Sequence, residues 1–423
     1  MSRIAAGFMT TFASLRNRNF RIFFTAQIIS VTGTWMQSIG QMWLVLHLTG
    51  SGLALGVTAA LQFTPMLLFG TWGGLLADRV DKRKLLMVTQ TAAGIEAFLL
   101  AGLTLGGIIQ LWMVYGLAFT LGMITVFDNP ARQSFVTEMV TRKQLINAVG
   151  LNSAVFTGAR VIGPAIAGVL IAAVGTGWCF LFNGVSYFPV VFGLFMMRPG
   201  ELNRGLPVAR ARGQIRAGIR YAWERPELRF PLLLMLVVGT LAFNFSIVLP
   251  LMAEFVFKSG ASTFGLLMSS MGVGAFVGAL VSAARAKPTH RLLALAGVGF
   301  GILLTGAAVA PNLPIELIVL VPLGAAMITF QATANSLLQL NSDATYRGRV
   351  MALYVIVFLG STPIGGPVVG WVAQEFGARA GLGLGGLATI IASAAILWAL
   401  GHWRVGERYR THPPVTDGGL AAG

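Results

Sequence analysis

Charged residues are scarce in this chain, and their scarcity excludes most soluble folds. Asp, Glu, Lys and Arg make up 10% of its 423 residues, whereas hydrophobic residues make up 56%. A soluble globular domain carries about 25% charged residues, so most of this protein's surface does not face water. The mean hydropathy of +0.77 agrees with this reading. The composition predicts an integral membrane protein.

Cysteine and histidine are also scarce. The single cysteine, Cys179, excludes an internal disulfide and a cysteine metal site. The 4 histidines are scattered, so no metal site is expected. Acidic residues are fewer than basic ones, 14 against 30, but the basic residues gather in alternate loops rather than on one face. This distribution argues against a nucleic-acid partner and favours a membrane protein with several spans.

Long apolar runs are what the chain has in abundance. A helix needs about 20 apolar residues to cross a bilayer, and twelve runs meet this length. They predict an all-α protein with twelve transmembrane helices. The expected limits are 20–46, 53–77, 84–107, 111–137, 146–173, 178–197, 230–256, 262–285, 291–310, 314–340, 348–375 and 381–403.

The basic residues predict the orientation of these helices. With both termini in the cytoplasm, all but three of the 30 Lys and Arg lie on the cytoplasmic side, Arg132 being counted with them. The exceptions are Arg160, inside a span, and Lys258 and Arg379 on the outer side. Because basic loops stay in the cytoplasm, we expect a multi-pass protein of the cell (plasma or inner) membrane.

An arginine-rich polar segment, 198–229, divides the chain. It separates an expected amino-terminal six-helix bundle, 1–197, from a carboxy-terminal one, 230–410. The segment is expected to lie in the cytoplasm, where it orients the protein and contacts anionic lipids; a regulatory role is the alternative. The Pro- and Gly-rich tail, 411–423, is expected to be disordered.

The two halves share a motif. The sequence IGPAIAG, with Gly163, Pro164 and Gly168, is echoed by GGPVVG, with Gly366, Pro367 and Gly370. Internal duplication in a membrane protein is typical of transporters whose site lies between the repeats. Glycine permits close backbone packing, and proline leaves a carbonyl without its helical donor. These motifs therefore predict close contacts and bends, plain helix packing being the simpler interpretation.

The loop between the second and third predicted helices carries six charges. Its sequence GLLADRVDKRK, Gly74 to Lys84, resembles the Gly-x-x-x-Asp-Arg-x-Gly-Arg-Lys signature of major facilitator superfamily transporters, from which Asp81 and Lys82 depart. Further motifs resemble the drug-efflux and siderophore-exporter branch, typified by enterobactin exporters and macrolide efflux pumps. These motifs are NFRIF (19–23), QIISVTGTW (27–35), DNPARQ (128–133), NAVGLNS (147–153) and ARVIGP (159–164). Thr34 stands where many relatives carry an acidic residue.

The resemblance implies two pseudo-symmetric six-helix bundles and a cytoplasmic gate made by Gly74, Asp78, Arg79, Arg83 and Asp128. Asp78 is expected to face the amino end of the inner part of the eleventh span, where helix N–H groups favour a negative charge. Arg79 or Arg83 is expected to bridge to Asp128. The alternative is that this loop only anchors the topology.

Three ionisable residues lie deep in the amino-terminal half, namely Glu96, Asp128 and Arg160. Charges inside spans are costly, so each is expected to face the bundle interior and find a partner. A rise of about 1.5 Å per residue places Glu96 and Arg160 at similar depths, so we expect them to meet. All three are candidates for proton coupling, a static ion pair being the alternative. Glu254 and Glu316, near outer helix ends, are expected to be wetted.

The resemblance also implies a central cavity lined by the first, fourth, seventh and tenth spans. Amide and aromatic side chains dominate those spans, which suits bulky amphiphilic molecules. The candidates for substrate contact are Gln27, Trp35, Gln37, Gln41, Phe243, Asn244, Phe245, Gln331 and Asn335. Each of these side chains has packing in a core or against lipid as its alternative.

Together these features predict a transporter that exports hydrophobic or amphiphilic small molecules, such as a drug, a siderophore or a natural product, by proton antiport. An importer or a lipid flippase or uniporter of the same fold is the alternative. No Walker motif is present, so the proton gradient and no cofactor is the expected energy source. No metalloprotease or serine-hydrolase motif is present, so no catalytic residue is expected. The expected partners are the substrate, protons and membrane lipids, with the protein as a monomer.

Overall fold

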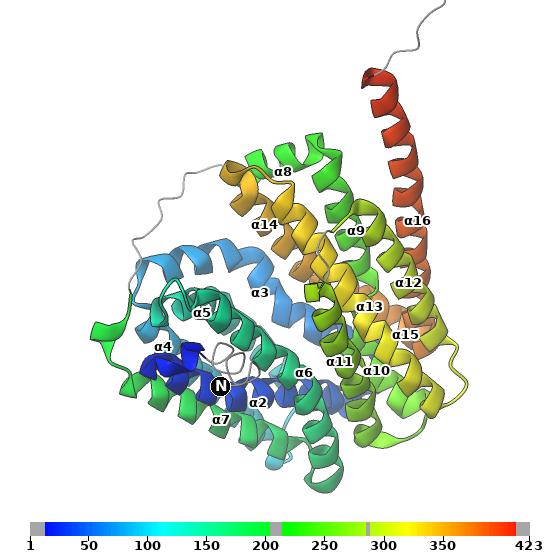
Figure 1. Cartoon of the computed structure of the whole chain (residues 1–423). Helices are drawn as coiled ribbons and strands as arrows, with labels where there is room; N and C mark the ends of the chain where they lie inside the picture. The colour runs from blue at the N-terminus through cyan, green and yellow to red at the C-terminus, as the bar shows by residue number, and fades with distance from the viewer. Residues whose placement is uncertain (1–12, 204–213, 285–287, 412–423) are drawn as a thin grey trace, which may run out of the picture.

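A computed structural model describes residues 13–203, 214–284 and 288–411, and regular structure in these ranges is helical (Figure 1). Within these described ranges, eleven segments are long and apolar enough to cross a membrane. The remaining predicted span, 20–46, corresponds to α2 (Arg18–Thr49), which is long enough at 32 residues but less apolar than the others. Its glutamines lower the hydropathy, and Gln27, Gln37 and Gln41 are all buried in the protein interior.

The first six membrane helices form the amino-terminal half. Helix α2 packs against α6 and α7, α4 packs against α5 and α7, and α3 packs against α5. A short 3-10 turn, η1 (Ala13–Arg16), precedes them. The remaining bounds are α3 Gly52–Arg79, α4 Lys82–Leu105, α5 Leu111–Met139, α6 Leu145–Val174 and α7 Thr176–Met196.

The carboxy-terminal half begins after a short 3-10 turn, η2 (Pro199–Glu201), and the amphipathic helix α8 (Gln214–Glu224). In this half α11 packs against α13, and α12 packs against α13 and α16. The bounds are α9 Pro226–Leu241, α10 Phe245–Leu251, the π-helical turn η3 Met252–Val256, α11 Gly260–Ala284, α12 His290–Ala308, α13 Leu313–Leu340, α14 Ala344–Leu359, α15 Thr362–Glu375 and α16 Ala378–Thr411. The predicted tail lies outside the described residues beyond Thr411.

Two predicted spans are interrupted, and neither interruption lies at a Gly-Pro motif. The span 230–256 breaks between α9 and α10, and the span 348–375 breaks between α14 and α15 at Gly360 and Ser361. Pro363 occupies the first turn of α15, where its missing N–H costs nothing, and this starts a new helix there. Helix α15 continues through Pro367, and α6 continues through Pro164. Neither Gly-Pro motif therefore interrupts its helix.

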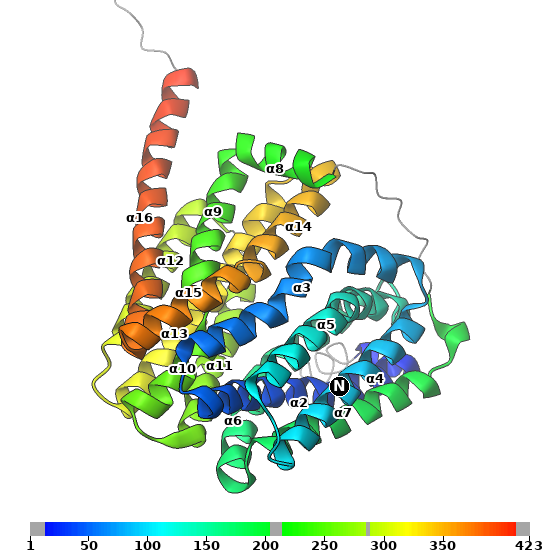
Figure 2. The same cartoon turned by 180° about the vertical axis from the view of Figure 1, so that it is seen from behind.

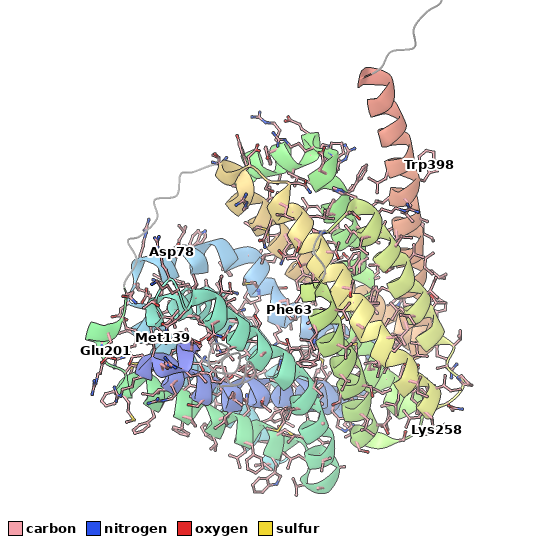
Figure 3. The ribbon with its side chains drawn as sticks, viewed as in Figure 1. Phe63, Asp78, Met139, Glu201, Lys258 and Trp398 are labelled. Atoms are coloured by element: carbon pink, nitrogen blue, oxygen red, sulfur yellow. The ribbon has the colours of Figure 1, made fainter. Side chains whose placement is uncertain are left out.

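The two halves are in contact mainly near one end. Helix α3 packs against α15, and α6 packs against α11, as Figure 2 shows for α3 and α15. Figure 3 labels Lys258 at the end where the halves meet and Asp78 at the other end, where α3 lies apart from α14. We call these the Lys258 end and the Asp78 end.

Paired glycines make the contact at the Lys258 end. A Cβ atom on Gly56 would overlap the carbonyl of Gly366, and one on Gly52 would lie 2.6 Å from the carbonyl oxygen of Gly370. Between α6 and α11, Gly168 meets Gly265 in the same way. Small residues spaced four apart let two helices approach until their backbones touch. We call the pairs between α3 and α15 the glycine seam.

Helix α8 is fastened to the start of α14 by Tyr221. Its ring stacks on that of Tyr346 with centroids 4.2 Å apart. Its hydroxyl donates to Asp343 at 2.8 Å and accepts from Arg225 at 2.7 Å and from the backbone N–H of Asp343 at 3.0 Å. The linker helix therefore belongs structurally to the carboxy-terminal half.

A Tyr221→Phe variant tests this attachment. Removing the hydroxyl breaks three hydrogen bonds but keeps the stacked ring, so we expect the docking of α8 to weaken by about 1–2 kcal/mol. Hydrogen exchange of the α8 amides should accelerate about five- to thirtyfold. Tyr346→Phe is the matched control, because it also keeps the stack, and exchange as slow as in the wild type is expected there.

Candidate functional site

Glu96 lies inside the amino-terminal half at the meeting point of three helices. It is 2% exposed on α4 and accepts a hydrogen bond of 3.0 Å from the Gln37 amide on α2. The side-chain amide oxygen of Gln37 accepts a hydrogen bond of 2.6 Å from the Asn183 amide on α7, and the Ser186 hydroxyl donates to the Asn183 side-chain oxygen at 3.1 Å. We call these four residues the Glu96 network.

One carboxylate oxygen of Glu96 remains without a partner. Its Oε2 receives the bond from Gln37, while its Oε1 is buried and has no hydrogen-bond donor among the described residues. Tyr187 lies beside the network, with its hydroxyl 3.4 Å from that of Thr34. Thr34 occupies the position at which the resemblance described above implies an acidic residue in many family members. Its contact with Tyr187 is between two uncharged hydroxyl groups. Glu96 is the acidic group of this region.

Asp128 on α5 is in contrast fully partnered. Arg132, one turn further along α5, donates two hydrogen bonds to its Oδ2, one of them 3.0 Å long. Thr89 and Gln90 on α4 each donate to its Oδ1 at 2.8 Å. Arg132 also donates to Gln27 on α2. We call these five residues the Asp128 network, which links α2, α4 and α5 through a buried ion pair.

The structure corrects the expected partners of Asp128. The side chain of Arg132, counted above with the cytoplasmic basic residues, is 13% exposed and pairs with Asp128 inside the bundle. Neither Arg79 nor Arg83 bridges to Asp128. Arg83 instead donates to the carbonyls of Leu194 and Phe195, at 2.5 and 2.9 Å. A cation at a helix carboxyl end stabilises the last carbonyls, so Arg83 serves as a cap for α7.

The remaining gate residues lie at the Asp78 end of α3. Gly74 and Asp78 are partly exposed and Arg79 is exposed. Asp78 forms no ion pair or hydrogen bond with the part of the chain that the structure describes, and it lies apart from α14 (Figure 3). Asp81, where the signature has Gly, accepts a bond from the Lys84 N–H at 3.2 Å and caps α4. The expected latch between Asp78 and the eleventh span is not formed in this arrangement.

Arg160 does not meet Glu96. Its guanidinium lies over the ring of Trp35, 5.3 Å from the ring centroid. The prediction of a Glu96–Arg160 pair is wrong because depth along a helix does not fix the side of the helix. Gln37 points toward Glu96 and Trp35 toward Arg160, and residues two apart on a helix face different sides.

The candidates for substrate contact separate into two groups. Gln27, Gln37 and Gln41 are 1–2% exposed, and the first two are occupied within the networks. Asn244 and Phe245 are also buried, and Asn244 donates to the carbonyl of Thr240. The partly exposed candidates are Trp35, Phe243, Gln331 and Asn335.

Glu316 is a buried residue that was predicted to be wetted. It is 0% exposed in the first turn of α13, and neither carboxylate oxygen has a hydrogen-bond partner among the described residues. Arg379 lies close enough to interact with its charge, while donating to the carbonyl of Ala310 at 2.7 Å. Glu254 is half-buried. Among the described residues, no group of three or more His, Cys, Asp and Glu is placed to hold a metal.

Sequence relatives with assigned roles cover nearly the whole chain. The staphyloferrin A transporter of Staphylococcus aureus is 25% identical, covering 88% of this chain and 93% of its own. The enterobactin exporter EntS of Citrobacter koseri is 24% identical, covering 94% and 95%. The multidrug efflux pump Tap of Mycolicibacterium fortuitum is 23% identical, covering 84% and 89%.

Solved structures show the same fold at low identity. The peptide transporter POT in complex with sulfate matches with a TM-score of 0.72 at 14% identity, covering 91% of this chain and 95% of that one. A bacterial homologue of the iron transporter ferroportin matches with 0.70 at 13%, covering 90% and 98%.

The family model of transmembrane secretion effectors matches residues 9–409. The described helices, the repeated halves and the sequence relatives agree with this match, and those relatives are transporters rather than enzymes. The chain belongs to the transmembrane secretion effector family, in the siderophore- and drug-exporting branch of the major facilitator superfamily.

Proposed function

We propose that this protein exports hydrophobic or amphiphilic small molecules in exchange for protons. The observation that carries the proposal is Glu96, a buried carboxyl group with one unpartnered oxygen in the interior of the first bundle. Carboxyl groups in such surroundings change protonation when water or a partner gains or loses access. When a transporter alternates between conformations that open at opposite ends, the access of water to such a carboxyl group changes.

Glu96 is the stronger of the two acidic candidates. Both oxygens of Asp128 accept hydrogen bonds, and two of these four bonds come from the guanidinium of Arg132. A carboxylate with all of its bonding positions filled by neighbouring helices serves helix packing. Asp128 therefore has a structural role in our proposal, and Glu96 carries the proton.

The proposal includes an orientation and a motion. We place the Asp78 end in the cytoplasm, together with both termini, because the basic loops lie there. The seam is then a contact at the outer end, while α3 and α14 lie apart at the cytoplasmic Asp78 end (Figure 3). Rocking of residues 1–197 against 230–410 would bring Asp78 toward α14 and open the seam. The exporters and the efflux pump among the relatives support the outward direction.

Proton release from the purified protein tests this function. Amphiphilic drugs and catecholate siderophores are added to the protein in weakly buffered nanodiscs, and a pH indicator reports released protons. Wild type is expected to release protons on binding, and Glu96→Gln is expected to bind without release. Glu316→Gln is the matched control, because Glu316 is equally buried but lies in the other half.

Two results would contradict the proposal. Compounds that bind to wild type without proton release would favour a uniporter or flippase. Release that persists in Glu96→Gln but disappears in Glu316→Gln would move the coupling group to the carboxy-terminal half.

A further inference from the structure

Arg160 is a cation near the middle of α6 without a counter-ion. Arg132, a second cation deep inside the amino-terminal bundle, is paired with Asp128, and Lys82 at the start of α4 is paired with Glu138 at 2.6 Å. No carboxylate of the described residues forms an ion pair with Arg160, and none of their polar atoms accepts a hydrogen bond from it. An unpaired charge within a span is costly, and such residues generally mark a functional pathway.

Trp35 holds the guanidinium in place without neutralising it. The cation lies 5.3 Å from the centroid of the indole, and the indole carries no negative charge. Gly163, in the turn of α6 that follows Arg160, makes room for this contact, since a Cβ there would lie 2.6 Å from the Cβ of Trp35. The glycine of the Gly-Pro motif therefore positions an aromatic ring beneath the cation.

The free edge of the guanidinium is its terminal pair of nitrogens. Nε is buried without a partner, whereas Nη1 and Nη2 are not among the fully buried polar atoms. Two parallel N–H groups on one edge match the two oxygens of a carboxylate. Arg160 also lies where the halves touch: its carbonyl oxygen packs near Gly272 of α11, and Ser269 donates to the next carbonyl, that of Val161, at 2.9 Å.

We propose that Arg160 and Trp35 form an anion subsite that binds a carboxylate of the transported molecule. The inference rests on the proposed function and narrows its substrate class to amphiphiles that carry a carboxylate. The bound carboxylate supplies the missing counter-ion of Arg160, so an acid binds more tightly at this position than its neutral ester. Because the subsite adjoins α11, binding of a carboxylate there also affects the contact between α6 and α11, and through it the carboxy-terminal half.

A matched pair of probes tests the subsite directly. Pyrenebutyrate and its methyl ester share an aromatic body and differ in the charge of one group. Binding of each to the full-length protein in nanodiscs of zwitterionic lipid is measured by fluorescence, with empty nanodiscs subtracted. Wild type is expected to bind the acid roughly ten- to a hundredfold more tightly than the ester, the range of a charge-assisted hydrogen-bonded pair.

The variants separate recognition from folding. Arg160→Gln is expected to abolish the preference for the acid while leaving ester binding unchanged, and Arg160→Lys is expected to retain part of it. The melting temperature of Arg160→Gln is expected to equal or exceed that of wild type, because an unpaired charge is removed from a span. Arg291→Gln removes an exposed cation elsewhere and should leave the preference intact.

Failure of the subsite and failure of the proposed function give different results. Equal binding of acid and ester by wild type, equal loss of both in Arg160→Gln, or the same effect in Arg291→Gln would each overturn the subsite, whatever the proton measurements show. Preference for the acid that depends on Arg160, together with no proton release on binding, would overturn the antiport mechanism and leave the subsite standing.

Discussion

An Arg132→Met variant is expected to lose about 3–5 kcal/mol of its free energy of unfolding. The ion pair between Arg132 and Asp128 is nearly buried, with side chains 13% and 8% exposed. Removing the cation leaves Asp128 as an uncompensated charge inside a bundle of apolar helices. The loss also releases Gln27, so three helices lose a shared contact at once.

The single cysteine gives a convenient measurement. Cys179 is 0% exposed on α7, in the same half as the ion pair, so a thiol-reactive fluorogenic dye labels it only as that half unfolds. Labelling during heating should begin at a clearly lower temperature for Arg132→Met than for wild type. Arg291→Met is the matched control, because Arg291 is exposed and forms no ion pair among the described residues.

A double variant identifies the cause of the loss. Asp128→Asn combined with Arg132→Met removes both charges, so it should recover a large part of the stability. If Cys179 in Arg132→Met becomes labelled at the same temperature as in wild type, the buried ion pair is not formed in the protein. If the double variant is as unstable as the single one, packing rather than charge accounts for the loss.

A Gly56→Ala variant is expected to part the two halves at the Lys258 end. The added Cβ would overlap the backbone carbonyl of Gly366, which cannot turn aside as a flexible side chain would. Overpacking of this kind costs about 1–3 kcal/mol, so the closed arrangement should become about tenfold less populated or more. Transport should fall with it, because one of the two alternating states is disfavoured.

Crosslinking across the seam measures the closed population. The Ser51 hydroxyl donates to the side-chain amide oxygen (Oε1) of Gln374 on α15 at 2.5 Å, so cysteines at these two positions report contact between the halves. The fraction linked by a short bifunctional thiol reagent should fall in Gly56→Ala. Gly158→Ala is the matched control, because nothing lies within 4 Å of its added Cβ.

A third glycine separates motion from folding. Gly274→Ala would drive its Cβ into the carbonyl of Val321, but both residues belong to the carboxy-terminal half. We expect this variant to lower stability while leaving the linked fraction of folded protein unchanged. Equal linking in Gly56→Ala and wild type would show that the seam does not control closure.

The sequence predicts the helices well because their signals are local. Length, hydropathy and loop charge identify the spans that the structure contains, and only α2 is weakened by its buried amides. The breaks after Leu241 and Leu359 are missed, because a polar or glycine residue inside an apolar run is compatible with a continuous helix. The sequence signal for the second break is Pro363, because proline is favoured in the first turn of a new helix.

The networks are harder to predict because their members are far apart in the chain. Depth along a helix suggests that Glu96 and Arg160 meet, but the rotation of each helix about its axis decides the partner. Two local signals were nevertheless present. Arg132 follows Asp128 by four residues, the spacing of a helical ion pair. The polar residues of α2 recur every three or four positions, as one buried face requires, at Gln27, Ser30, Thr34, Gln37 and Gln41.

The glycine seam also sets the thermodynamic scale of the conformational change. Apolar burial contributes about 25 cal/mol per Å² of surface removed from water, and a contact between Gly56 and Gly366 buries almost no side-chain surface. Their backbone groups stay bonded within their own helices when the seam opens, so the glycine pairs themselves lose no hydrogen bond. The exposed bonds that the Gln374 side chain accepts from the Ser51 hydroxyl and the Leu53 N–H are replaced by bonds to water. Opening this end therefore has a small intrinsic cost. A few kcal/mol of differential binding suffices to invert such an equilibrium, and this is the scale that one ligand can supply.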